Sequence, residues 1–227
     1  MRVVPWLTER YAPETVLDVG CGLGTWAAVF ADRGCNVLGL DGEEVPDALL
    51  QIPRGDFRVV DLEERVDSPG RYDLALCLEV AEHLTDPAGR RLVQFLTSAS
   101  DRILFSAAVP GQGGDHHLNE RWPQYWQQLF AGQGYRFDDE IRWRFWEDEG
   151  IEWWYRQNMF IVERSEVISP PVQAVVHPRL FEGALERKDR AMDDLYHGKV
   201  PLRTGLLVFA RAILNALGRA KRVLVRS

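Results

Sequence analysis

The sequence lacks any long hydrophobic run. No stretch of about 18 consecutive apolar residues occurs, so no membrane-spanning helix is predicted. The N-terminal residues include a proline and no apolar core, which is unlike a signal peptide. Cysteine is scarce: Cys21, Cys35 and Cys77 form an odd set without metal-ligand spacing, and we interpret them as reduced thiols. Together these absences predict a cytoplasmic protein.

Positive charge is also in short supply. Lys and Arg total 27 against 34 Asp and Glu, and the net charge of −7 argues against a general nucleic-acid partner. No internal repeat or low-complexity segment occurs. With 227 residues, of which 46% are hydrophobic and 27% charged, the chain suits one main globular domain with an appendage.

The stretch Val16–Trp26 (VLDVGCGLGTW) carries the most informative pattern. An apolar run ends at Asp18, glycines follow at positions 20, 22 and 24, and a helical pattern begins at Thr25. This order predicts a strand, a tight turn and a helix N-terminus. Glycine permits left-handed backbone angles and lets a ligand approach the main chain, while the helix start offers unpaired N–H groups.

The order of acid and glycines resembles motif I of the class I S-adenosylmethionine (SAM) methyltransferases. A dinucleotide fingerprint reads G-x-G-x-x-G, whereas this turn reads D-x-G-x-G-x-G. The resemblance implies that SAM is the cofactor and that S-adenosylhomocysteine (SAH) is the product formed from it. It also implies that the turn surrounds the methionine part of SAM. A Rossmann-like turn that serves another nucleotide is the alternative. The cofactor contacts implied here are Asp18, Gly20, Cys21, Gly22, Gly24 and Trp26.

Acids at the ends of the next two predicted strands extend the resemblance. The second strand leads into Asp41-Gly42, where a carboxylate can accept both ribose hydroxyls of SAM. The third leads into Asp61-Leu62, where the resemblance implies that the acid accepts the adenine amino group and the leucine packs on the ring. A capping or turn-forming role is the alternative for both acids.

The stretch Glu79–Leu84 (EVAEHL) follows the predicted fourth strand and resembles a segment common in small-molecule methyltransferases. Ligands of α/β sheets bind at strand carboxyl ends. The resemblance therefore implies that Glu79 and Val80 lie at the methionine end of the cofactor and that His83 lies beside the substrate. A histidine that only packs the loop is the alternative.

Strands and helices alternate along the chain, which is typical of a parallel, doubly wound sheet. The predicted fold class is α/β: a Rossmann-like seven-stranded sheet, parallel with an antiparallel last strand, plus a C-terminal helical extension. The expected strands are 15–19, 36–40, 57–60, 72–78, 102–108, 135–146 and 152–164. The expected helices are 1–11, 25–33, 86–100 and 120–131, with a brief helix or turn at 48–53.

The glycine-rich loop 109–119 (VPGQGGDHHLN) is the second informative stretch. Methyl transfer to a hydroxyl needs a group that takes its proton, and histidine titrates near working pH, so His116 or His117 is the expected general base. Asp115 and Asn119 are expected to bind the substrate. Two alternatives stay open: the histidines shape the loop, or histidines and carboxylates hold a divalent metal. Adjacent histidines rarely share a metal, so no metal site is expected.

Aromatic side chains in the second half supply the remaining substrate candidates. Two aromatics with a Tyr and an Arg can hold a sugar ring or an acidic group, although core packing explains many of them. The candidates are Trp122, Trp154, Tyr155 and Arg156. Over residues 1–165 the chain resembles a bacterial methyltransferase subgroup of surface-polysaccharide and natural-product clusters.

The predicted function is O-methylation of a small-molecule or glycan substrate by SAM. Methylation of a carboxylate, phosphonate or amine is the alternative within enzymes, and a non-catalytic SAM-fold subunit of a biosynthetic complex is the alternative outside them. No nucleic-acid partner is expected, because Glu79–Glu82 stands where a nucleic-acid methyltransferase carries N/D-P-P-Y/F. The oligomeric state is left open.

Three regions are expected along the chain: a methyltransferase domain (1–165), a linker with a charged helix (166–198) and a basic amphipathic helix (199–227). The last region has seven basic residues and no acid, so the remainder of the chain carries a net −14. Such a helix suits an anionic membrane, with the protein peripheral on its inner face, or an acidic partner. Packing on the chain's own acidic body is the alternative.

Overall fold

The structure is a computed structural model that describes residues 2–42, 45–67, 70–167, 169–211 and 214. Its contacts divide the chain into two units, residues 1–180 and 181–227. Each unit is described by itself.

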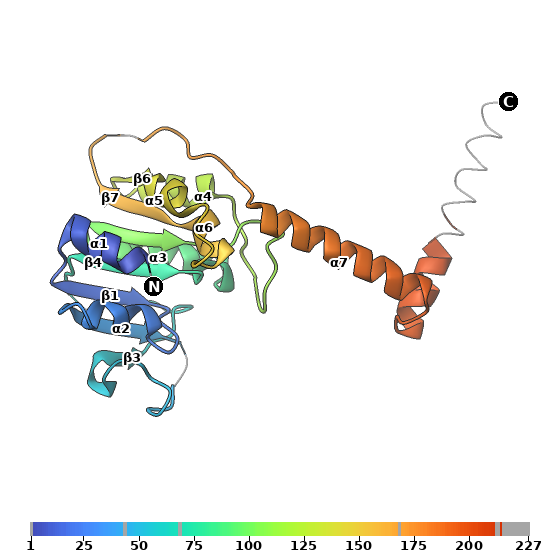
Figure 1. Ribbon diagram of the computed structural model, residues 1–227, viewed down its shortest axis with the longest axis horizontal. Helices are drawn as coiled ribbons and strands as arrows, with labels where there is room; N and C mark the ends of the chain where they lie inside the picture. Colours follow the sequence, from blue (N-terminus) through green and yellow to red (C-terminus); the bar gives the residue numbers. More distant parts are fainter. Residues whose placement is uncertain (1, 43–44, 68–69, 168, 212–213, 215–227) are drawn as a thin grey trace. The chain divides into compact units, whose positions relative to one another are not determined.

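The first unit is built on one seven-stranded sheet with the strand order β3-β2-β1-β4-β5-β7-β6 (Figure 1). All neighbours pair in parallel except β7, which is antiparallel to both β5 and β6. The predicted fold class is confirmed. The strands are β1 Thr15–Val19, β2 Asn36–Asp41, β3 Phe57–Val59, β4 Leu74–Leu78, β5 Arg102–Ser106, β6 Tyr135–Asp138 and β7 Phe160–Arg164.

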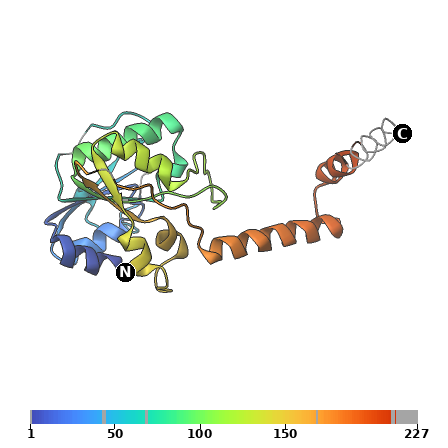
Figure 2. The ribbon, with the colours of Figure 1, turned by 90° about the horizontal axis from the view of Figure 1, so that it is seen from above.

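Helices cover both faces of this sheet, as the view from above shows (Figure 2). Alternate side chains of a strand point to opposite faces, so Ala75 and Cys77 of β4 join one core cluster, while Leu74 and Leu76 join the other. The first cluster takes its helical residues from α3 and α4, and the second from α1, α2 and α5. The helices are α1 Val3–Tyr11, α2 Thr25–Ala31, α3 Asp86–Ala99, α4 Pro123–Ala131, α5 Glu140–Phe145 and α6 Trp153–Asn158.

The predicted sixth and seventh strands were too long. Only 135–138 and 160–164 are extended, and the helices α5 and α6 occupy the parts predicted as strand continuations. The apolar residues Ile141 and Phe145 are buried at a spacing of four, which is helical and not alternating. In α6 the three consecutive residues 156–158 are all buried, which an alternating strand with one solvated face does not allow.

The charged helix predicted at 180–196 is confirmed as α7, Pro178–Tyr196. Residues 202–211 are helical, but a large part of the basic helix predicted within 199–227 lies outside the described residues. Among the helices that the structure describes, none has the length and apolarity needed to cross a membrane.

Candidate functional site

The glycine turn joins β1 to α2 at the carboxyl edge of the sheet. Gly20, Gly22 and Gly24 have φ of +74°, +54° and +78°, the left-handed region that favours glycine. A Cβ on Gly20 would lie 2.2 Å from a methyl carbon of Val80, so only glycine lets the turn pack against the segment after β4. A Cβ on Gly22 would meet nothing within 4 Å, so the turn is open on that side.

Asp41 ties the end of β2 to this turn. Its Oδ2 accepts a hydrogen bond of 2.7 Å from the Gly22 N–H. Gly42 follows on the exposed side, and Cys21 is buried under the turn. The structure therefore brings together the ribose candidate and the glycine turn that the sequence placed in separate segments.

Asp18 lies beneath the turn. Its buried carboxylate accepts the Ala27 N–H at 3.2 Å, in the first turn of α2. Burial, with the nearby charge of Asp41, raises the pKa of Asp18 to about 7. This position lets Asp18 support the backbone of the turn from the inside.

Glu79 stands at the end of β4 with a left-handed backbone, φ +56°. Its N–H donates to the carbonyl and the hydroxyl of Ser106, both at 3.1 Å. Its carboxylate accepts hydrogen bonds from Gln112 at 2.8 Å and Asn158 at 3.1 Å. Burial raises the pKa of Glu79, and these hydrogen bonds act against that rise.

The sequence did not single out Gln112 or Asn158 as site residues. Gln112 lay in the glycine-rich loop without a distinguishing pattern, and Asn158 was expected in a strand. In the structure Asn158 lies in α6, where its amide also donates to Gln112 at 2.9 Å.

Aromatic side chains border the same edge. The rings of Trp26 and Tyr155 meet edge to face, 5.3 Å between centroids. Burial raises the pKa of Tyr155, and the charges of Glu79 and Asp18 add to the rise, which places this hydroxyl near both carboxylates. Trp154 packs on Tyr155, with 6.0 Å between ring centroids.

Two of the substrate candidates are engaged in other hydrogen bonds, and a third is exposed at the surface. Arg156 is buried and donates to the carbonyl of Trp146 at 3.0 Å. Asn119 is buried and accepts from Arg121 at 2.8 Å. Trp122 is 40% exposed at the start of α4.

The loop 109–119 folds back onto the short 3-10 helix η2, Ala81–His83. The N–H groups of Leu118 and Asn119 donate to the Glu82 carbonyl at 2.8 and 2.9 Å. This brings the His117 ring against the His83 ring, perpendicular and 4.9 Å between centroids. Two histidines that lie 34 positions apart in the sequence thus meet, a contact that the sequence did not predict.

A carboxylate orients His117. Glu120 lies 3.0 Å from the His117 Nδ1 and also accepts the N–H groups of Gly111 and Gly113 at 2.7 and 2.8 Å. His116 is exposed beside it with φ +57°, and Asp115 is exposed too. The sequence did not predict the role of Glu120, although its spacing of three from His117 is a usable signal.

Glu82 is fully buried next to these histidines. Burial, followed by the charge of Glu79, raises the pKa of Glu82 to about 9. Glu82 belongs to the EVAEHL stretch identified in the sequence, but no function was predicted for it.

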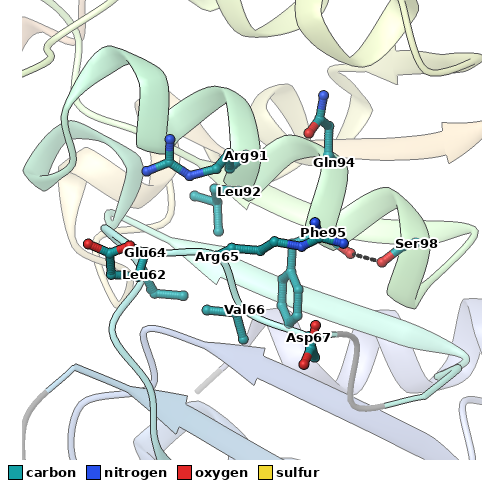
Figure 3. A pocket seen from close by; sticks show the side chains of 10 residues that line it. All are labelled: Leu62, Glu64, Arg65, Val66, Asp67, Arg91, Leu92, Gln94, Phe95 and Ser98. Atoms are coloured by element: carbon teal, nitrogen blue, oxygen red, sulfur yellow. Dashed lines mark hydrogen bonds between the residues drawn. The ribbon is translucent and has the colours of Figure 1, made fainter.

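The adenine candidates lie after β3. Asp61 is exposed, and its Oδ1 accepts the Glu63 N–H at 2.9 Å in a local turn. Leu62 is half-buried and lines a surface pocket of about 490 Å³ between the segment 62–67 and α3 (Figure 3). Leu62 is the one predicted cofactor residue that lines this pocket, so the pocket is separate from the glycine turn.

Comparison with known proteins gives a consistent picture. A family model described as "Methyltransferase domain" matches residues 2–157. The ubiquinone biosynthesis O-methyltransferase of Pseudomonas paraeruginosa is 43% identical over 94 residues, which are 37% of this chain and 40% of the relative. The chain thus matches less than half the length of that relative.

Solved structures resemble the chain at the level of the fold. The magnesium protoporphyrin IX methyltransferase of Synechocystis PCC 6803, with bound SAH, aligns with a TM-score of 0.55 and 22% identity over 72% of this chain and 80% of that one. The 1,6-didemethyltoxoflavin-N1-methyltransferase of Burkholderia thailandensis aligns with a TM-score of 0.52 and 17% identity, over 71% of this chain and 76% of that one.

The raised pKa of Asp18 makes stability depend on pH. The folded chain keeps a proton that the unfolded chain, with an ordinary value near 3.8, has already lost, so stability falls as pH rises toward 7. Between pH 4 and pH 8 this group should lower the free energy of unfolding by up to about 4 kcal/mol. Asp18→Asn keeps an oxygen for the Ala27 N–H, and urea unfolding at several pH values should show a shallower fall. Superimposable pH profiles would contradict the assignment.

Proposed function

Since the chain belongs to the methyltransferase domain family, matched over residues 2–157, we propose that it transfers a methyl group from SAM to a hydroxyl of a small-molecule or sugar-containing substrate. The observation that carries this proposal is the glycine turn with Asp41 hydrogen-bonded to it, together with the contact between His83 of η2 and His117 of the loop after β5. The O-methyltransferase name of the relative from Pseudomonas supports the choice of oxygen.

The residues at the carboxyl edge fit SAM. The turn is open at Gly22, where a Cβ would meet nothing within 4 Å, and glycine backbone can therefore line a ligand there. Asp41 ends β2 in the position of a ribose acceptor, and Glu79 offers a half-buried carboxylate for the methionine end. In this proposal Gly20, Cys21, Gly24, Trp26 and Val80 form the wall of the cofactor site, Asp18 supports it, and Gly42, Asp61 and Leu62 serve its nucleoside end.

SAM supplies a reactive methyl group on a sulfonium, so the protein's own task is to position the acceptor and manage its proton. We propose that the acceptor hydroxyl loses its proton near three histidines, His83, His116 and His117. Glu120 holds the His117 ring in a fixed orientation, as a base needs, and His116 stands exposed beside it.

The state of Arg156 favours a hydroxyl acceptor over an acidic one. A carboxylate or phosphonate substrate calls for a cationic partner, and the Arg156 guanidinium is buried against the Trp146 carbonyl. Trp122, Trp154, Tyr155 and Asp115 remain the proposed substrate residues, whereas the predicted Asn119 is buried and held by Arg121. Amine methylation is the second candidate, because the toxoflavin-pathway structure resembles this fold.

The Asp41 carboxylate should carry much of the cofactor affinity. Asp41→Ala removes a charged acceptor and the partner of the Gly22 N–H, so SAH binding should weaken by about 1–3 kcal/mol. Calorimetric titration with SAH measures this, with Asp41→Asn as the variant that keeps an acceptor and loses the charge. Unchanged affinity in Asp41→Ala would refute the cofactor assignment.

The chemistry of the product separates the candidate acceptors. The protein is incubated with labelled SAM and a panel of phenols, sugars, carboxylic acids and amines. The labelled products are then treated with mild alkali, which cleaves methyl esters and leaves ethers and N-methyl groups intact. We expect an alkali-stable ether, and the double variant His116→Ala/His117→Ala should lower kcat by about 10²–10⁴.

The matched control for that experiment is His197→Ala in the second unit, which should leave kcat unchanged. An alkali-labile product formed at the full rate by the double variant would establish carboxylate methylation instead, since a carboxylate has no proton to lose.

We propose that the basic region 199–227 binds an anionic membrane surface and takes no part in methyl transfer. Its seven basic residues stand without an acid, against a net −14 on the rest of the chain. The full chain should sediment with phosphatidylglycerol vesicles and stay in solution with phosphatidylcholine, whereas a chain ending at residue 198 should sediment with neither. Equal sedimentation of both chains would count against a membrane role.

A further inference from the structure

Three ligand-type side chains converge beside the proposed acceptor site. One carboxylate oxygen of Glu82 and one ring nitrogen each of His83 and His117 all lie within 4.8 Å of one another. The two residues of η2 and the residue from the loop 109–119 are held in this arrangement by the hydrogen bonds from Leu118 and Asn119 to the Glu82 carbonyl.

The Glu82 carboxylate needs a partner that the described protein atoms do not provide. Its side chain is 0% exposed, and neither oxygen has a hydrogen-bond partner among the described residues. Ionising a buried carboxylate without a partner is costly, which is why the pKa of Glu82 is raised, and buried charges in proteins are normally paired or bound to a metal.

The outer contacts of the two histidines match those of metal ligands. Ligating histidines usually bond their second ring nitrogen to a carboxylate or a backbone carbonyl, which fixes the ring. Glu120 lies 3.0 Å from the His117 Nδ1, which leaves Nε2 as the nitrogen able to bind a metal. A ring N–H of His83 donates to backbone carbonyl oxygens of Asp115 and His116.

We propose that Glu82, His83 and His117 bind a divalent cation of the class that accepts imidazole nitrogen together with carboxylate oxygen, such as Zn²⁺, Mn²⁺ or Co²⁺. Two imidazoles disfavour Mg²⁺ and Ca²⁺, which prefer oxygen ligands. Three protein ligands leave coordination positions open, and the exposure of His83 puts the open side within reach of a small molecule.

The use of the cation rests on the proposed function, whereas its binding does not. A substrate hydroxyl at the open position would lose its proton to solvent more readily, because the cation stabilises the oxyanion. His117 is then a ligand and not the base. The metal-free sequence expectation rested on the adjacent pair His116-His117, but the structure pairs His117 with His83 instead.

The test uses the full chain, stripped with EDTA and titrated with Co²⁺ by visible absorption and with Zn²⁺ by calorimetry. We expect one equivalent of either metal, with affinity at least tenfold weaker in Glu82→Gln and in His117→Ala. His116→Ala is the matched control, because it removes the neighbouring loop histidine and should keep the full equivalent.

Thermal unfolding distinguishes a variant that has lost the metal site from one that has failed to fold. Without metal, Glu82→Gln should melt close to the wild-type temperature, because the raised pKa of Glu82 leaves that side chain uncharged near neutral pH. Zn²⁺ should raise the melting temperature of the wild type only. A wild type that binds neither metal, or a Glu82→Gln variant that binds as the wild type does, would overturn the site. SAH titration of the same samples distinguishes failure of the cation site from failure of the proposed function. A protein that binds SAH but no metal would refute the cation site and leave the cofactor assignment in place.

Discussion

The hydrogen bonds to the Glu79 carboxylate hold the site together. Glu79 directly follows β4, while its donors Gln112 and Asn158 come from the loop after β5 and from α6, so one side chain joins three segments far apart in the sequence. Its left-handed backbone costs on the order of 1–3 kcal/mol. The two hydrogen bonds to Ser106 offset that strain, and the loop 109–119 depends on the whole network for its position at the carboxyl edge.

Local chemistry made the cofactor side predictable. The left-handed turn needs glycine at fixed positions, and Gly20 has no room for a side chain. The spacing of the glycines therefore indicates the backbone conformation of the turn. Asp41 follows from the same logic, because parallel strands end at one edge of a sheet and their terminal residues meet there. Short apolar runs predicted the first five strands, whereas the antiparallel last strand was an expectation from the methyltransferase resemblance, and the sixth and seventh strands were predicted too long.

The acceptor side was less predictable, because its contacts are long-range. Nothing near Glu82 in the sequence shows that its carboxylate is buried without a donor, since that depends on how the loop 109–119 folds back over η2. Asn158 was hidden by an error in secondary structure: an aromatic, β-prone run was interpreted as strand, although tertiary packing makes it α6. His83 and His117 were each predicted, but their meeting was not.

The helical form of α6 has a consequence for how the chain can change length. Tyr155 and Asn158 are three residues apart, so a helix presents them on one side, where both lie near Glu79. Inserting or deleting one residue within that turn would rotate one of them by about 100° relative to the other. A change in the number of residues between Tyr155 and Asn158 should therefore move one of them away from Glu79, and the buried Arg156 and Gln157 between them limit substitution as well.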